Sequence, residues 1–322
     1  MSLFVSLRLD PRSVADTRLL VSHADRAGVD LVTLDDRFTG GGPRLDALAT
    51  ASFLGPQTRD IGLAPTVTTT QTEPFHVATA TQTLDLVSRG RGAWVVDVSL
   101  DDESAQVVGR RPVPGATAAW TEALDVVRAV RALWDSWQDD AVIRDRATSR
   151  YIDADRLHYV DVVVRGTDAT FGVKGPSIVP RTPGGQPVVV VRLPTGAAAD
   201  DPRWPVVAEQ ADIVVVDGPV PDDDALARTV GEVRIRASGR PVLVFAGPHG
   251  RGVAHLVRDA ATWDVDGIEL AGHTAADTDA VSAVLTGIAA AGRRAPRRQE
   301  LGATLRDRLG LPRPQNRFEV VA

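Results

Sequence analysis

Residues 61–99 read IGLAPTVTTTQTEPFHVATATQTLDLVSRGRGAWVVDVS, and this stretch decides the fold. The apolar, β-branched run Ile61–Val67 predicts a strand, and Gly92–Val98 predicts a second one. Between them Pro74–Val87 predicts a helix, and Pro74 suits its first turn because the missing N–H has no partner there. A strand, a helix and a second strand in this order form the repeating unit of a parallel α/β fold.

The same alternation extends in both directions along the chain. Further strands are predicted at Leu3–Leu7, Asp30–Leu34, Pro187–Arg192, Ile213–Val216, Pro241–Phe245 and Gly267–Leu270. Further helices are predicted at Ser13–Ala27, Leu45–Leu54, Thr117–Trp137, Pro205–Gln210, Asp222–Arg236, Val253–Thr262 and Ala275–Ala291. An open doubly wound sheet can also be drawn from this pattern. Eight strand–helix pairs over about 250 residues favour a closed (β/α)₈ barrel of the TIM type.

Two segments depart from the alternation. Residues 139–187 are irregular and polar, with short hairpin strands expected near His158–Val164 and Phe171–Val173. Residues 292–322 read as a short helix followed by an extended tail over the body. We therefore expect a single α/β domain of residues 1–322, a TIM-type barrel with an insertion between its fourth and fifth strands.

Composition excludes several classes of protein. The net charge of −6 argues against a nucleic-acid partner, which requires a basic surface. The sequence contains no apolar run long enough for a membrane span, and its first residues do not resemble a signal peptide. Cysteine is absent, which rules out disulfides and thiolate chemistry. We expect a cytoplasmic protein.

Polar residues follow each predicted strand, where the active sites of such barrels lie. They include Arg8, Asp10, Asp35, Asp36, Thr68, Asp97, Ser99, Arg192, Thr195, Asp217, Gly247, His249, Gly272 and His273. Asp35 and Asp36 are adjacent, so we expect one to face the barrel mouth and the other to cap a helix or bind Arg37. We expect no metal site, although His249 and His273 could approach Asp217, because their spacing is not diagnostic.

The pair Thr195–Gly196 lies between a buried strand and a helical stretch. A hydroxyl and a glycine amide at a helix N-terminus would suit a phosphate, because free N–H groups and the helix dipole favour an anion. A simple cap or turn explains the same two residues equally well. The sequence contains neither a GxSxG elbow nor a P-loop.

Three stretches together resemble one family. They are residues 61–99, residues 132–161 (ALWDSWQDDAVIRDRATSRYIDADRLHYVD) with 175–191 (GPSIVPRTPGGQPVVVV), and residues 304–318 (TLRDRLGLPRPQNRF). They are similar to the nitrilotriacetate and dibenzothiophene-sulfone monooxygenases of the bacterial-luciferase-like flavin monooxygenase superfamily. Because they occur in the family's order, the combination is specific.

The resemblance implies a two-component, FMN-dependent monooxygenase. Such enzymes take reduced FMN from a separate flavin reductase, add O₂ to it and oxygenate a small organic substrate, often as dimers. The oxidative chemistry is the cofactor's, so the resemblance identifies no catalytic side chain. It implies a homodimer or a heterodimer with a related subunit.

The resemblance also implies which residues contact the cofactor. Asp36 corresponds to an acidic position near the flavin ring, and Ser99 corresponds to the serine that ends the fourth strand. Residues matching other cofactor positions are Thr66 and Thr68 in the third strand and Thr195 and Gly196 at the phosphate. Arg192 could pair with the phosphate as well.

Four positions depart from the family's pattern. Val95, Val98, Ala116 and Trp120 stand where relatives carry polar or flavin-contacting residues. Two alternatives therefore stay open. One is a non-catalytic member or partner subunit of the same fold with a degraded flavin site, and the other is a deazaflavin-dependent oxidoreductase.

Overall fold

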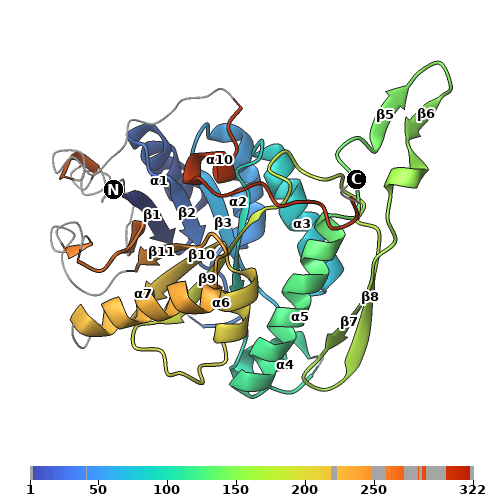
Figure 1. Ribbon diagram of the computed structural model, residues 1–322. Coiled ribbons are helices and arrows are strands. Elements are labelled where there is room, and N and C mark those ends of the chain that lie inside the picture. Colours follow the sequence, from blue (N-terminus) through green and yellow to red (C-terminus); the bar gives the residue numbers. More distant parts are fainter. Residues whose placement is uncertain are drawn as a thin grey trace.

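Eight parallel strands form a closed barrel in the computed structural model, with helices packed around its outside (Figure 1). The structure describes residues 3–40, 42–109, 111–218, 223–247, 259–260, 262–271, 282, 285–287 and 302–319. The barrel strands are β1 (Phe4–Leu9), β2 (Leu31–Leu34), β3 (Gly62–Thr68), β4 (Ala93–Asp97), β9 (Val188–Pro194), β10 (Ile213–Asp217), β11 (Leu243–Ala246) and β12 (Gly267–Ala271). Pairing of β1 with β12, from Phe4–Gly267 to Arg8–Ala271, closes the ring.

Most of the strand residues are buried, as expected for a parallel barrel covered by helices. The helices are α1 (Val14–Ala27), α2 (Ala47–Leu54), α3 (Pro74–Val87), α4 (Asp102–Val108), α5 (Ala116–Trp134), α6 (Trp204–Gln210), α7 (Asp223–Ala237) and α10 (Leu305–Leu309). Short 3-10 turns occupy Gly55–Gln57 and Ala154–Arg156. Helix ends follow local chemistry. The Ser13 side chain caps α1, and Gly28 ends it with a positive φ of 93°.

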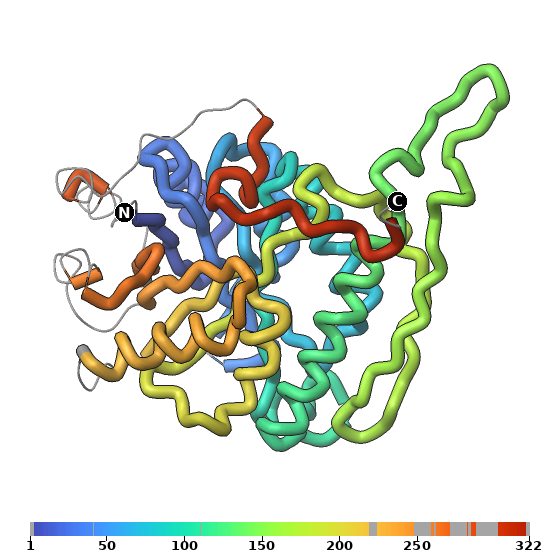
Figure 2. The backbone as a smooth tube through the Cα atoms, in the orientation of Figure 1, coloured from blue at the N-terminus to red at the C-terminus, as the bar shows by residue number. Residues whose placement is uncertain are grey.

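The insertion consists of two hairpins between β4 and β9. Strands β5 (Val142–Asp145) and β6 (Arg150–Ile152) form an arm that projects from the body, whereas β7 (Asp161–Arg165) and β8 (Thr170–Lys174) run beside α5 (Figures 1 and 2). Val164 and Val173 of the second hairpin are buried in the main core. The predicted position of the insertion is confirmed, although the sequence analysis missed the first hairpin and helix α4.

The C-terminal segment closes the end of the barrel opposite the strands' carboxyl ends. Leu305, Leu309 and Leu311 pack with the barrel's interior side chains, among them Leu31 and Val188. The remaining tail continues across the body to the foot of the hairpins (Figure 2), where Asn316 donates to the carbonyl oxygens of residues 135 and 137. The predicted short helix and extended tail are therefore confirmed over residues 302–319.

The predicted barrel is confirmed, and each predicted barrel strand overlaps an observed one. Most of the helix predicted at Ala275–Ala291 and most of the one at Val253–Thr262 lie outside the described residues, as do His249, Gly272 and His273. No helix in the described part of the chain combines the length and the apolarity that a bilayer crossing requires.

Candidate functional site at the barrel mouth

The carboxyl ends of the strands carry a layer of paired charges. Arg8 of β1 donates from Nε to Asp35, at 2.8 Å, and from Nη1 to Asp217 of β10, at 2.7 Å. All three side chains are 22–29% exposed, so they lie where the mouth of the barrel meets solvent. The two carboxylates thereby hold Arg8 across the opening of the barrel.

A second ion pair lies deeper in the same opening. Glu269 of β12 is fully buried and accepts from Arg192 of β9, with Nη1 2.6 Å from Oε2 and Nη2 3.1 Å from Oε1. Thr33 donates its hydroxyl to the same carboxylate at 2.9 Å. Burial by itself would lower the pKa of Arg192, but Glu269 outweighs it and raises that pKa, so the guanidinium stays charged. The guanidinium of Arg192 is therefore held by Glu269 in a buried ion pair.

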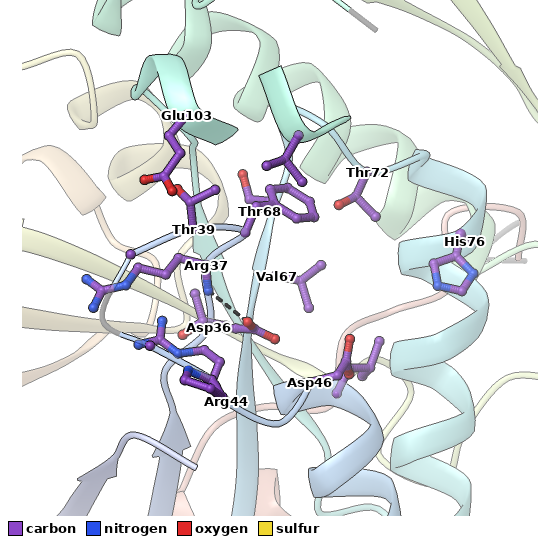
Figure 3. A pocket seen from close by; sticks show the side chains of 17 residues that line it. Asp36, Arg37, Thr39, Arg44, Asp46, Val67, Thr68, Thr72, His76 and Glu103 are labelled. Carbon is purple, nitrogen blue, oxygen red and sulfur yellow. Dashed lines mark hydrogen bonds between the residues drawn. The ribbon is translucent and has the colours of Figure 1, made fainter. Parts of the chain in front are cut away.

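A chamber of about 840 Å³ opens beside this layer, between the loop after β2, the end of β3 and the starts of α3 and α4 (Figure 3). Its walls include Asp36, Thr68 and His76, together with the apolar side chains Leu48 and Val67. Figure 3 shows Asp36 and Arg44 at one side of the chamber and His76 at the other. A cavity of this size and mixed polarity is typical of small-molecule sites.

Asp36 braces the chamber wall. Its carboxylate accepts from the backbone N–H of Ala47, at the start of α2, and from that of Arg37, both at 2.7 Å. Asp35 instead faces Arg8 at the mouth. The division of roles predicted for the two aspartates is therefore confirmed. Burial raises the pKa of Asp36 above its ordinary value, while its backbone hydrogen bonds act in the opposite direction.

The predicted cofactor residues divide into two groups. Thr66, Thr68 and Asp36 line the chamber, and Ser99 lies 3.0 Å from Thr68 between the two hydroxyl oxygens. The second group, Arg192, Thr195 and Gly196, follows or belongs to β9. Arg192 of this group lines a recess of about 170 Å³ next to the chamber.

Thr195 and Gly196 do not form a helix N-terminus, so that part of the phosphate argument is wrong. They lie in a turn after β9, and helix α6 begins only at Trp204. Their backbone amides are already bound, Thr195 to the carbonyl of Asp217 at 2.8 Å and Gly196 to the hydroxyl of Thr229 at 2.9 Å. An amide that already has a partner cannot donate to a phosphate without breaking that bond.

For the FMN that the resemblance implies, the residues present would therefore suit one end only. The chamber supplies hydroxyls and a carboxylate suited to the polar edge of a flavin ring. At the other end, the amides of residues 195 and 196 are engaged and the charge of Arg192 is neutralised by Glu269. The donor set of this turn thus does not fit the phosphate group of FMN.

Each of the four positions that depart from the family's pattern carries an apolar side chain. Val95 is 1% exposed and faces the barrel interior beside the recess. Ala116 opens α5, and Trp120 is buried on the same helix with the Arg203 guanidinium 5.9 Å from its ring centroid. Val98 is partly buried against the main core. Val95, Val98 and Trp120 therefore provide packing contacts, whereas Ala116 is exposed.

Glu269 and Thr33, which complete the interior ion pair, are not among the site residues predicted from the sequence. A signal was present, because Glu269 stands inside the apolar run GIEL and Arg192 directly follows VVVV. Opposite charges within two buried strands of one barrel predict a buried pair. In the described part of the chain, no group of three or more His, Asp or Glu side chains is placed to hold a metal ion.

Comparison with known proteins identifies the family. The profile of the luciferase-like monooxygenases matches residues 3–249. The chain belongs to the luciferase-like monooxygenase family. One of the subunits of pristinamycin IIA synthase from Streptomyces pristinaespiralis is 32% identical over 96% of this chain and 95% of its own length.

Other relatives match over a shorter part. Dibenzothiophene-sulfone monooxygenase of Rhodococcus erythropolis is 34% identical over 47% of this chain and 32% of its own length. N-acetyl-S-(2-succino)cysteine monooxygenase of Bacillus subtilis is 32% identical over 53% of this chain, and this chain spans only 40% of that protein. The crystal structure of a long-chain alkane monooxygenase superposes with a TM-score of 0.84 over 96% of both chains at 18% identity, which shows the shared fold.

Proposed function

We propose that this chain is one component of an FMN-dependent two-component monooxygenase and that the FMN phosphate is held by a second, related subunit. A flavin reductase would supply the reduced FMN, and the substrate would be a small organic molecule. The proposal combines two hypotheses from the sequence: that the chain is part of a monooxygenase, and that it is a partner subunit with a degraded flavin site.

One observation carries the proposal: the groups expected to bind the phosphate are bound to other parts of the protein. Arg192 is held by the buried Glu269, and the amides of Thr195 and Gly196 donate within the barrel. The nearby carboxylates of Asp35 and Asp217 would also repel a phosphate dianion. Loss of several charge-assisted contacts would weaken FMN binding by orders of magnitude.

The relative that aligns along nearly its whole length supports the same proposal. The pristinamycin IIA synthase chain is named as one subunit of a larger enzyme, and it aligns with this chain from end to end. Dibenzothiophene-sulfone monooxygenase and N-acetyl-S-(2-succino)cysteine monooxygenase align with this chain over only 32% and 40% of their lengths. We infer that this barrel works beside another chain, in a heterodimer. No contact in the described structure favours a deazaflavin over FMN.

The chamber residues keep a proposed role in this subunit. Asp36, Thr66, Thr68 and Ser99 lie at or beside one cavity, and their oxygens can orient a polar ring or a substrate group. The walls would exclude water from that group. Reduced FMN, when bound in the assembled enzyme, would supply the oxidative chemistry.

Anaerobic titration with reduced FMN tests the proposal. The chain alone should show no saturable quenching of tryptophan fluorescence at low micromolar FMN. Oxygen-dependent product formation should require a reductase and a second luciferase-like chain from the same organism. Micromolar binding by the chain alone, weakened by Asp36→Ala and Thr195→Ala, would instead establish a self-contained FMN enzyme.

A further inference from the structure

The end of β4 places a carboxylate inside the barrel mouth. Val95 packs in the barrel interior, and Asp97 lies two residues further along the same strand, so it faces inward as well. The Asp97 side chain is exposed and lines the recess of about 170 Å³ beside Arg192. A ligand that enters the recess can therefore reach this carboxylate.

The Asp97 carboxylate has no cationic partner among the described residues. It accepts the backbone N–H of Val98 at 2.9 Å, while Arg192, the nearest guanidinium to affect it, is bound to Glu269. Burial raises the pKa of Asp97 above its ordinary value, and the charge of Asp35 acts in the same direction, against the Val98 hydrogen bond and Arg192. A carboxylate that is accessible to a ligand, poorly hydrated and unpaired is stabilised by a cation.

The recess and the adjoining chamber carry more negative than positive charge. Their combined lining includes six carboxylates and four arginines, a formal net charge of −2. Three of these arginines, Arg8, Arg44 and Arg192, are already held in ion pairs. Arg37 has no ion pair in the described part of the chain, but it is exposed on the loop after β2, where water solvates it. An anion would add to the excess of carboxylates, whereas a cation would reduce it.

The chamber offers room for the rest of such a ligand. Four residues line both spaces, namely Asp36, Arg37, Arg44 and Thr66. Four apolar side chains line the chamber beyond them, namely Phe38, Leu48, Val67 and Val107. A molecule with its charged end at Asp97 would thus place its apolar part in the chamber (Figure 3).

We infer that this site binds a substrate that carries a protonated amine, with its ammonium group against Asp97 in the recess and its apolar part in the chamber. The carboxylate of Asp97 would accept hydrogen bonds from the ammonium N–H groups, so Asp97 determines the specificity of the site. The inference rests on the proposed function, in which this subunit holds substrate and leaves the FMN phosphate to its partner.

Three probes of matched shape test the ligand class. At neutral pH phenylbutylamine is a cation, phenylbutanol is neutral and phenylbutyrate is an anion. Calorimetric titration of the full chain, without flavin, should give the strongest binding for the amine. It should bind about tenfold more tightly than the alcohol, the effect of one charge-assisted hydrogen bond. The anion should bind most weakly, because the lining has a net negative charge.

Variants of single charged residues locate the ammonium group. Asp97→Asn should weaken binding of the amine about tenfold, to the affinity of the alcohol, and leave binding of the alcohol unchanged. Its fold should be retained, because asparagine keeps an oxygen for the Val98 N–H, and circular dichroism checks this. Asp140→Asn is the matched control, because it removes the same charge from a side chain that is 62% exposed and outside the recess. Arg37→Gln should strengthen binding of the amine about twofold, because it removes a like charge from the lining.

Three results would overturn the inference. Equal binding of the three probes would mean that the site recognises no charge. Tightest binding of phenylbutyrate, lost in Arg37→Gln, would mean that the site selects an anion. A preference for the amine that survived Asp97→Asn would mean that Asp97 does not hold the ammonium group. The titrations contain no flavin, so they do not depend on where the FMN phosphate is bound, and failure of the two proposals can be distinguished.

Discussion

At the residue scale, the Arg192–Glu269 pair makes a testable contribution to stability. Replacing Arg192 by Gln should cost about 3 kcal/mol, because a fully buried carboxylate would lose its charged partner. Adding Glu269→Gln should recover most of that loss. Urea unfolding of the two single variants and the double variant measures the coupling energy.

The control is a pair at the surface. Arg150 is 56% exposed and lies 3.1 Å from Asp153, so Arg150→Gln should change stability by less than about 0.5 kcal/mol. If Arg192→Gln proved as neutral as Arg150→Gln, the interior pair would contribute nothing to the fold. Glu269 would then also not hold Arg192 away from other ligands.

Asp85 of α3 makes stability depend on pH. Burial raises its pKa to about 6, against the hydrogen bond from the Gly92 amide and the charges of Arg306 and Arg91. The folded state therefore binds a proton more tightly than the unfolded state, whose value is 3.8. The contribution of Asp85 falls as pH rises from about 4 to 6 and then stays constant.

The variant Asp85→Asn should remove this penalty. It should be more stable than the native chain at pH 8, by up to about 3 kcal/mol, with the difference vanishing near pH 4. Urea unfolding of both proteins across this range isolates Asp85, because every other titrating group is common to both. A variant less stable at all pH values would show that the carboxylate is ionised and needed by its arginine neighbours.

At the element scale, the two hairpins of the insertion should contribute unequally. The β5–β6 arm exposes Ile143 and Tyr151, whereas Val164 and Val173 of the second hairpin are buried in the core. Replacing residues 143–151 by two glycines should shift Tm by less than about 2 °C, because little apolar area is lost. Calorimetry of the shortened chain measures this.

The matched comparison is Val164→Ala in the second hairpin. It should cost about 1–3 kcal/mol, since it leaves a cavity against α5. If the arm deletion and Val164→Ala lowered stability equally, the arm would have to pack against the body. The assignment of the arm as a projecting element would then be incorrect.

At the scale of the whole molecule, the order of elements could be predicted from the sequence, but the contacts across the barrel could not. The run Ile61–Val67 identifies β3 because its apolar residues are adjacent in the sequence, so the pattern lies within one short stretch. The pairing of Arg192 with Glu269 joins residues 77 positions apart, and each apolar run by itself shows a single charge but not its partner. The turn at Thr195 cannot be predicted for the same reason, because the amides of residues 195 and 196 bind Asp217 and Thr229, which closure of the barrel brings near.

The C-terminal segment closes the base of the barrel and contacts both β3 and the start of β10. We therefore expect the first and second halves of the barrel to unfold together. The amide of Leu305 donates to Gly90, and its side chain lies so close to Gly62 of β3 that a Cβ there would be 2.7 Å away. Arg306 binds Asp212, just before β10, at 2.8 Å. Truncation after Gly302 should therefore lower stability by about 5 kcal/mol, from three buried leucines. Native-state hydrogen exchange should accelerate equally in β3 and β10, because α10 contacts both halves. Acceleration confined to one strand would mean that the halves of the barrel are separate cooperative units.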